Sequence, residues 1–220
     1  MLEKKLVVAI DGPAGAGKST AAQLAAKKLG YTYIDTGAMY RAVAWLTLQQ
    51  GKPVSDALIL SVLPGIDVDL CYSDGKTTVS VNGTDITKEI RTPEVSKIVS
   101  QVARLGPVRE KMVELQRKMA ARGGVLMDGR DIATAVLPNA DVKIFLTASI
   151  EERAKRRWKE MQEKGYAMSL EALQKDIAAR DKADMEREIS PLRQAEDAIL
   201  LDTTGLSIDE VVDRILALCA

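Results

Sequence analysis

A glycine-rich segment near the N-terminus, GPAGAGKST at residues 12–20, constrains the fold of this chain more than any other stretch. It follows an apolar run at 6–10 and precedes an alanine-rich segment at 19–29 that is suited to a helix. This order predicts a strand, a tight loop and a helix, which is the context in which such a segment binds phosphate. The alternative, a turn that only joins strand to helix, does not need Lys followed by Ser at its end.

Each residue type in this loop has a separate role in holding phosphate. The glycines Gly12, Gly15 and Gly17 let the backbone adopt conformations that side chains would forbid, so successive N–H groups can point at one anion. Lys18 offers a mobile positive charge to the β- and γ-phosphates, and Ser19 offers a hydroxyl to Mg²⁺ at the positive end of a helix dipole. The predicted ATP-binding residues are Gly12, Pro13, Ala14, Gly15, Ala16, Gly17, Lys18, Ser19 and Thr20.

The composition excludes several classes of function. The chain has 220 residues and no histidine, so Ser-His-Asp hydrolysis and histidine-ligated zinc are ruled out, whereas phosphoryl transfer depends mainly on positive charge and positioning. Lys plus Arg and Asp plus Glu both number 31, a balance that argues against a nucleic-acid partner. Cys71 and Cys219 form no metal spacing and indicate a reducing, cytoplasmic setting. No apolar run suggests a signal peptide or a membrane span.

The alternation of apolar and polar residues predicts an α/β fold. Strands are expected at 6–10, 31–35, 125–127, 142–146 and 198–201, and helices between and after them. Such an alternation gives a five-stranded parallel sheet with helices on both faces, of the P-loop NTPase type. Residues 66–87 alternate with period two around turns at 73–76 and at Asn82-Gly83, which predicts a small antiparallel β-meander inserted in the α/β pattern.

Charged residues directly after strands are candidates for a site, because ligands bind beyond the carboxyl ends of parallel strands. Asp128-Gly129-Arg130-Asp131 follows one strand, and a helix carrying Thr36 and Arg41 follows another. The structural alternatives are that Asp131 caps the next helix and pairs with Arg130, that Thr36 is an N-cap, and that Arg41 is solvated.

Two later helices carry arginines on one face. Arg153, Arg156 and Arg157 share a face of the helix that begins at 149, and Arg180, Asp184 and Arg187 share a face of the helix at 169–188. Ordinary i,i+4 ion pairs on solvated helices are the alternative explanation of both patterns.

The phosphate-binding loop predicts a nucleotide ligand, but switches, motors and small-molecule kinases share it. The remaining motifs indicate which of these reactions the chain performs. The turn Asn82-Gly83-Thr84-Asp85 lacks the lysine of a GTPase base reader, so a switch is disfavoured. A small-molecule kinase must hold a second phosphate in line with ATP and surround the transferring group with guanidiniums. The arginines available for this are Arg41, Arg109, Arg130, Arg153, Arg157, Arg180 and Arg187.

The motifs together resemble the bacterial cytidylate kinase family over essentially the whole chain. They are IDGPAGAGKST, DTGAMYR, SQVA, PVRE, DGRD, KIFLTAS with EERAKRRWKE, and ARDKADMEREISPL. The resemblance implies ATP-dependent phosphorylation of CMP and dCMP with Mg²⁺ by a monomer. It also implies a single nucleoside monophosphate kinase domain over 1–220, with a core at 1–35, 92–148 and 189–220, a monophosphate-binding region with the meander at 36–91, and a helical lid at 149–188.

The resemblance also implies roles for individual residues. Thr36, which stands where many relatives have Ser, and Arg41 would hold the monophosphate, and Ser100, Arg109 and Asp131 would contact the cytosine or its surroundings. Arg130 would contact the acceptor phosphate, and Arg180, Asp184 and Arg187 would bind its sugar and phosphate. Arg153 and Arg157 would close over the transferring phosphate, so the catalytic set is Lys18, Arg130, Arg153 and Arg157. Independently, a carboxylate at Asp131 and a donor at Arg109 complement the amino group and the acceptors of cytosine.

Two other interpretations of the sequence stay open. One is a related kinase acting on UMP, AMP or a non-nucleotide acceptor, and the other is a non-catalytic ATP-binding regulator. The acceptor specificity separates the first from a cytidylate kinase, and ATP consumption separates the second.

Overall fold

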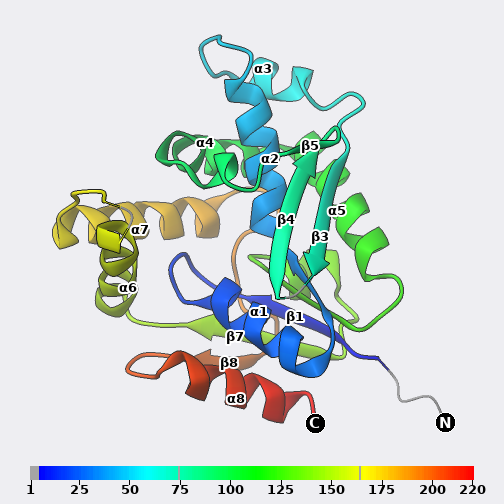
Figure 1. The fold of residues 1–220 in the computed structure, drawn as a ribbon, viewed down its shortest axis with the longest axis vertical. Helices are drawn as coiled ribbons and strands as arrows, with labels where there is room; N and C mark the ends of the chain where they lie inside the picture. The colour runs from blue at the N-terminus through cyan, green and yellow to red at the C-terminus, as the bar shows by residue number, and fades with distance from the viewer. Residues whose placement is uncertain (1–4, 74, 164) are drawn as a thin grey trace.

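A computed structural model describes residues 5–73, 75–163 and 165–220 as an α/β fold around one parallel sheet (Figure 1). The sheet has the order β2-β6-β1-β7-β8 and consists of β1 (Val7–Asp11), β2 (Thr32–Asp35), β6 (Val125–Gly129), β7 (Val142–Thr147) and β8 (Ile199–Asp202). All four strand pairings are parallel. The predicted five-stranded parallel sheet is therefore confirmed, and its strands begin or end one or two residues from the expected bounds.

Helices cover both faces of the sheet because successive strand residues point to opposite sides. Val8 and Ile10 of β1 pack with α1 (Lys18–Leu29) and α8 (Ile208–Leu218), whose alanines and valines allow close approach. Ala9 points to the other face, where α5 (Gly106–Ala120) and the π-helical turn 132–136 cover Met127. The core of the sheet is thus apolar on both sides.

A second region extends away from the sheet toward the top of Figure 1. It contains α2 (Thr36–Leu48), α3 (Asp56–Ser61), the three-residue helix Glu89–Arg91 and α4 (Pro93–Arg104). Beside α2 lies the predicted meander, the antiparallel sheet of β3 (Val68–Ser73), β4 (Lys76–Val81) and β5 (Thr84–Asp85). The turn expected at 73–76 includes residue 74, which lies outside the described residues. These elements share one apolar cluster, which includes Met39, Ile59, Val79 and Val99.

The helices α6 (Ile150–Glu163) and α7 (Leu170–Glu186) pack against each other at one side of the sheet (Figure 1). Ala154 of α6 and Leu173 and Ile177 of α7 form their small apolar contact. Among the described residues, no helix combines the length and the apolar character that crossing a membrane requires.

Candidate active site

The loop that follows β1 has the backbone geometry of an anion nest. Gly12, Gly15 and Gly17 all have positive φ, and a Cβ at Gly12 would lie 1.9 Å from the carbonyl oxygen of Leu146. Only glycine fits at that close approach to β7. Lys18, at the first turn of α1, is buried, and its Nζ donates to the carbonyl of Pro13 over 2.7 Å. Burial and then the charge of Arg130 hold the pKa of Lys18 well below its usual range, so the site gains from an added anion.

A buried carboxylate lies beside this loop because β6 ends next to β1 and β2. The register pairs Asp11 with Gly129 and Asp35 with Asp128. Asp128 accepts hydrogen bonds from the Ser19 hydroxyl at 2.9 Å and from the Tyr33 hydroxyl at 2.7 Å. Burial, with the nearby charge of Asp35, raises the pKa of Asp128 to about 6. Hydroxyl and carboxylate oxygens of this kind are ligands that Mg²⁺ accepts in proteins.

The start of α2 differs from the N-cap alternative considered for Thr36. Asp35 is the N-cap, and its carboxylate accepts from the Ala38 N–H at 2.9 Å. Thr36 is buried, and its hydroxyl donates to the backbone carbonyl of Asp128 at 2.7 Å. The N-cap interpretation of Thr36 is wrong because the carboxylate of Asp35, the preceding residue, already accepts from the free N–H of the first helical turn. Thr36 instead joins the beginning of α2 to the end of β6.

Several guanidinium groups gather near Lys18 from separate elements. Burial and the charges of Arg130 and Arg41 lower the pKa of Arg180 of α7 to about 10. Its Nε is buried without a hydrogen-bond partner. Burial also lowers the pKa of Arg41 to about 10, and the charge of Arg157 contributes to this shift. We call Arg41, Arg130, Arg157 and Arg180 the arginine cluster. Like charges held close together are stabilised by an anion between them, so the arginine cluster is suited to phosphate groups.

Arg41 and Arg157 have different surroundings within this arginine cluster. Arg41 is not merely solvated, because its Nη1 donates to the Ser96 hydroxyl at 2.9 Å and to the Ile90 carbonyl at 3.3 Å. Arg157 pairs with Glu160 at 3.0 Å on the surface of α6, which is the ordinary helical ion pair that the sequence allowed. A guanidinium held only by such a pair can be drawn to an added phosphate at little cost.

A second buried carboxylate, Asp131, lies between two arginines. Arg109 of α5 contacts one of its oxygens through Nη2, and Nη2 of Arg187 lies 3.4 Å from the other. The capping alternative for Asp131 is wrong, since its side chain makes no cap hydrogen bond to the turn 132–136. It is also not paired with Arg130, which donates instead to Asp184 over 2.8 Å. Asp131 is thus a positioned hydrogen-bond acceptor at the edge of the sheet.

The backbone that carries Asp131 is fixed to the end of β1. Both carboxylate oxygens of Asp11 accept from backbone N–H groups, those of Ile132 and Ala133, each at 2.8 Å. Burial raises the pKa of Asp11 to about 6 despite these two hydrogen bonds. One residue therefore connects the strand that leads into the phosphate-binding loop with the segment that carries Asp131.

A cavity of about 360 Å³ adjoins Arg187 between α4 and α7. Ser100, Gln101 and Arg104 line it from α4, and Ala183 and Glu186 line it from α7. Ser100 thus lies at the same cavity as Arg187, although these residues are far apart in the sequence. Asp184 is buried on α7, one helical turn after Arg180. Of the candidate site residues, Ser100 and Arg187 line this cavity.

Arg153, which the resemblance implies would close over the transferring phosphate, contacts the backbone of the phosphate-binding loop in this structure. Its side chain is buried, and its Nη1 donates to the Ala14 carbonyl at 2.8 Å and to Asp181 at 2.6 Å. Its Nε donates to the Ala148 carbonyl at 2.9 Å. The backbone of the loop is therefore the partner of this guanidinium, because the first turn of α6 packs directly against Gly15.

Comparisons with known proteins identify the family of this chain. The family model described as cytidylate kinase matches residues 8–220. The chain belongs to the cytidylate kinase family. It is 55% identical to the cytidylate kinase of Bacillus subtilis over 98% of this chain and 96% of that protein. It is 54% identical to the cytidylate kinase of Bacillus licheniformis with the same coverage.

A likeness to a solved structure supports the fold alone. An uncharacterized protein from Eubacterium ventriosum superposes with a TM-score of 0.53 at 13% identity, and the match covers 97% of both chains. Membership of the cytidylate kinase family identifies the chain as a nucleoside monophosphate kinase with ATP as the phosphoryl donor.

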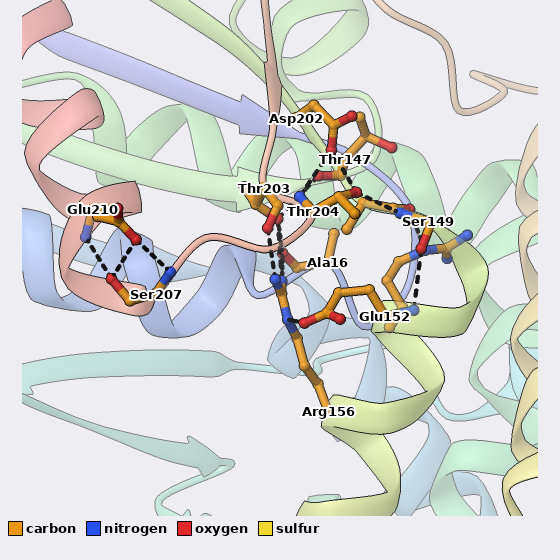
Figure 2. A network of polar contacts seen from close by, with 12 residues as sticks. Ala16, Thr147, Ser149, Glu152, Arg156, Asp202, Thr203, Thr204, Ser207 and Glu210 are labelled. Carbon is orange, nitrogen blue, oxygen red and sulfur yellow. Dashed lines mark hydrogen bonds and ion pairs between the residues drawn. The ribbon is translucent and has the colours of Figure 1, made fainter.

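Four residues without a role predicted from the sequence lie at this site, in contact with the loop, with Asp128 or with the segment after Asp131: Asp11, Tyr33, Arg156 and Asp181. Asp11 ends a strand at the edge where ligands bind, so its position was a usable signal. Arg156 shares the face of Arg153, yet its contacts with Ala16 and Thr203 come from segments distant in sequence (Figure 2). No local sequence pattern predicts that Asp181 or Tyr33 lies at this site.

Proposed function

We propose that this chain transfers the γ-phosphoryl group of Mg-ATP to CMP and dCMP. The observation that carries the proposal is the buried Asp131 between Arg109 and Arg187, fixed through Asp11 to the strand that leads into the phosphate-binding loop. A carboxylate accepts from the amino group of cytosine, and an arginine donates to its ring acceptors. Uracil would turn a carbonyl oxygen toward Asp131, which is unfavourable. This pairing supports cytosine over uracil.

The acceptor phosphate is proposed to lie among Arg41, Arg130 and Arg180. The lowered pKa values of Arg41 and Arg180 and the unpartnered Nε of Arg180 support an anion at this place. Asp184 accepts from Arg130 and orients that guanidinium, and it also suits the ribose hydroxyls. Thr36 helps to hold the monophosphate near the end of β6, and Ser100 contacts the base side of the cavity.

The transferring phosphoryl group is proposed to lie between Lys18 and the arginine cluster. Lys18 leaves the Pro13 carbonyl to contact the β- and γ-phosphates, while the backbone N–H groups of 15–19 enclose them. Arg130 and Arg157 then neutralise the charge that spreads over the equatorial oxygens. No strong base is required, since the transition state is largely dissociative.

Mg²⁺ is proposed to be held by Ser19, with Asp128 orienting it directly or through water. No group of three or more acidic, histidine or cysteine side chains suited to a metal occurs within 5–73, 75–163 and 165–220, so the phosphates of ATP complete the ligand set. When bound, the ion neutralises phosphate charge and aligns the donor. Two buried carboxylates, Asp35 and Asp128, close enough for one to raise the pKa of the other, fit a divalent cation.

The domain organisation is proposed to follow the two regions beside the sheet. Residues 36–91 would enclose the acceptor together with α4, and 149–188 would act as the lid that excludes water from the transferring group. The enzyme is proposed to act as a monomer, as the resemblance to the family implies.

An assay of ADP formation from Mg-ATP tests the function. CMP, dCMP, UMP, AMP, GMP and no acceptor are compared in parallel. Turnover that strongly favours CMP and dCMP over UMP supports the proposal. Equal rates with UMP, or the same ATP consumption without an acceptor, would contradict it.

A further inference from the structure

The carbonyl groups of the phosphate-binding loop are held by two arginines of α6. Nη1 of Arg153 donates to Ala14 O at 2.8 Å, and Nη1 of Arg156 donates to Ala16 O at 3.2 Å. The two arginines are one helical turn apart, and the two carbonyls belong to alternate residues of the loop. In an anion nest the N–H groups face the ligand and the carbonyls face away, so donors behind the loop stabilise the nest.

Asp181 of α7 completes this contact at Ala14. Its Oδ2 accepts from Arg153 at 2.6 Å, and its Oδ1 accepts from the Ala14 N–H at 3.1 Å. Asp181 and Arg153 are both buried. The ion pair thus holds both the N–H and the carbonyl of one loop residue. Buried charged pairs that are fully hydrogen-bonded fix geometry more than they add stability.

Thr203 holds the second arginine in place. Its carbonyl accepts from Arg156 Nη2 at 2.7 Å, and its hydroxyl lies 3.1 Å from Nη1 (Figure 2). Thr203 is fully buried after β8, and its N–H donates to the carbonyl of Thr147 at the end of β7. Glu152 pairs with Nε of Arg156 at 3.2 Å on the other side. Arg156 is therefore held by Thr203, which is itself bonded to the end of β7.

We propose that Arg153, Asp181 and Arg156 are positioning residues that hold the phosphate-binding loop open for ATP and join it to the helix that binds the acceptor. Asp181 directly follows Arg180 and lies one turn before Asp184 on α7. Its contact with Ala14 therefore links the donor loop to two acceptor residues. Binding of either nucleotide fixes the same ion pair, so each nucleotide strengthens binding of the other. The link to the acceptor residues rests on the proposed function, whereas the positioning of the loop for ATP does not.

The first measurement is calorimetric binding of ATP with Mg²⁺ and no acceptor. Asp181→Asn and Arg153→Lys are expected to weaken ATP binding by about 10- to 100-fold, the range for loss of a hydrogen bond to a charged group. Arg156→Lys is expected to act in the same direction. Asp176→Asn is the control, because Asp176 is an exposed carboxylate on the same helix. Hydrogen exchange of the peptide containing 12–20 should become faster in the three variants and stay unchanged in the control.

A double variant separates positioning from stability. Arg153→Met with Asp181→Leu removes both charges together, which leaves no buried charge unpaired. We expect it to fold and to bind ATP as weakly as the single variants. Wild-type ATP affinity and wild-type exchange at 12–20 in a folded double variant would overturn the proposal.

The coupling between the nucleotides is the second measurement. In the wild type, a saturating acceptor should tighten binding of a non-hydrolysable ATP analogue, and Asp181→Asn should abolish this effect. If wild-type protein binds ATP but phosphorylates neither CMP nor dCMP, the proposed function fails, while the ATP measurements still decide the role of the three residues. If the coupling is the same in wild type and Asp181→Asn, the link to the acceptor helix is disproved.

Discussion

The hydroxyl of Ser19 donates to the carboxylate of Asp128 across 2.9 Å, which joins the first turn of α1 to the end of β6. Tyr33 donates to the other oxygen of the same carboxylate at 2.7 Å. Both hydrogen bonds are strongest when Asp128 is ionised, because a carboxylate is an acceptor at both oxygens. The pKa of Asp128 is about 6, so the ionised form predominates at neutral pH.

Replacement of Asp128 by Asn should lower kcat by about 10² or more, the size expected when an electrostatic contact at a transferring group is lost. The Mg²⁺ concentration needed for half-maximal activity should rise as well. In the wild type, kcat/KM should fall as the pH falls through about 6, and the variant should lose this limb. Titrations of activity with Mg²⁺ and with pH provide the check. Asp197→Asn, at an exposed carboxylate paired with Lys143, should match the wild type in both.

Asp131→Asn should relax the choice between bases. The preference for CMP over UMP in kcat/KM should fall by about 10² or more, because one amide oxygen replaces a carboxylate and the amide nitrogen can donate to uracil. ATP affinity without an acceptor should stay the same. The variant should also lose stability, by up to about 3–5 kcal/mol, because Arg109 and Arg187 lose a buried counter-charge. Unchanged selectivity in the folded variant would remove Asp131 from base recognition.

Arg180→Met should stabilise the ligand-free protein and weaken acceptor binding. The pKa of Arg180 is lowered by burial and by two neighbouring arginines, so the folded state disfavours its charge and a neutral side chain removes that cost. The gain should be on the order of 1 kcal/mol, or about 2–4 °C in Tm for a chain of this length. CMP should raise the Tm of the wild type much more than that of the variant. A variant less stable than the wild type without ligand would contradict this account.

Asp11→Asn should change how stability depends on pH. Asp11 has a folded pKa of about 6, above its ordinary value of 3.8, so the folded state holds the proton more strongly than the unfolded state between these values. Its contribution to stability is therefore lost as the pH rises from about 4 to about 6. The variant should gain stability relative to the wild type by up to about 3 kcal/mol over this window. Urea unfolding at pH 4, 5, 6 and 7 measures the difference, and a constant difference would refute it.

Local patterns in the sequence were enough to predict the architecture. The period-two run at 66–87 predicts the antiparallel sheet, and apolar runs separated by helical segments predict the parallel one. The Asn82-Gly83 turn joins β4 to β5, and Asn82 has a positive φ as that turn requires. These features depend on neighbouring residues, so they can be read without knowing the tertiary structure.

The environment of the charged side chains could not be predicted in the same way. Arg153 and Arg157 look alike in the sequence, one turn apart on a charged helix, but the first is buried and the second pairs at the surface. The carbonyl of Ala14, which Arg153 contacts in the phosphate-binding loop, lies 139 residues away in the sequence. Only packing of α6 against the loop distinguishes the two arginines, and helical periodicity contains no information about that contact.

The carboxylate of Asp11 bears on how the specificity for the acceptor base can be altered. It fixes the segment bearing Asp131 to the strand that leads into the phosphate-binding loop, entirely within the core of the sheet. In the proposed site, rigid elements would thus set the distance between the two nucleotides, while α2, α4 and α7 would shape the space around the acceptor. A library aimed at a new acceptor base can therefore vary Ser100, Arg109 and Arg187 and leave the alignment of the donor intact.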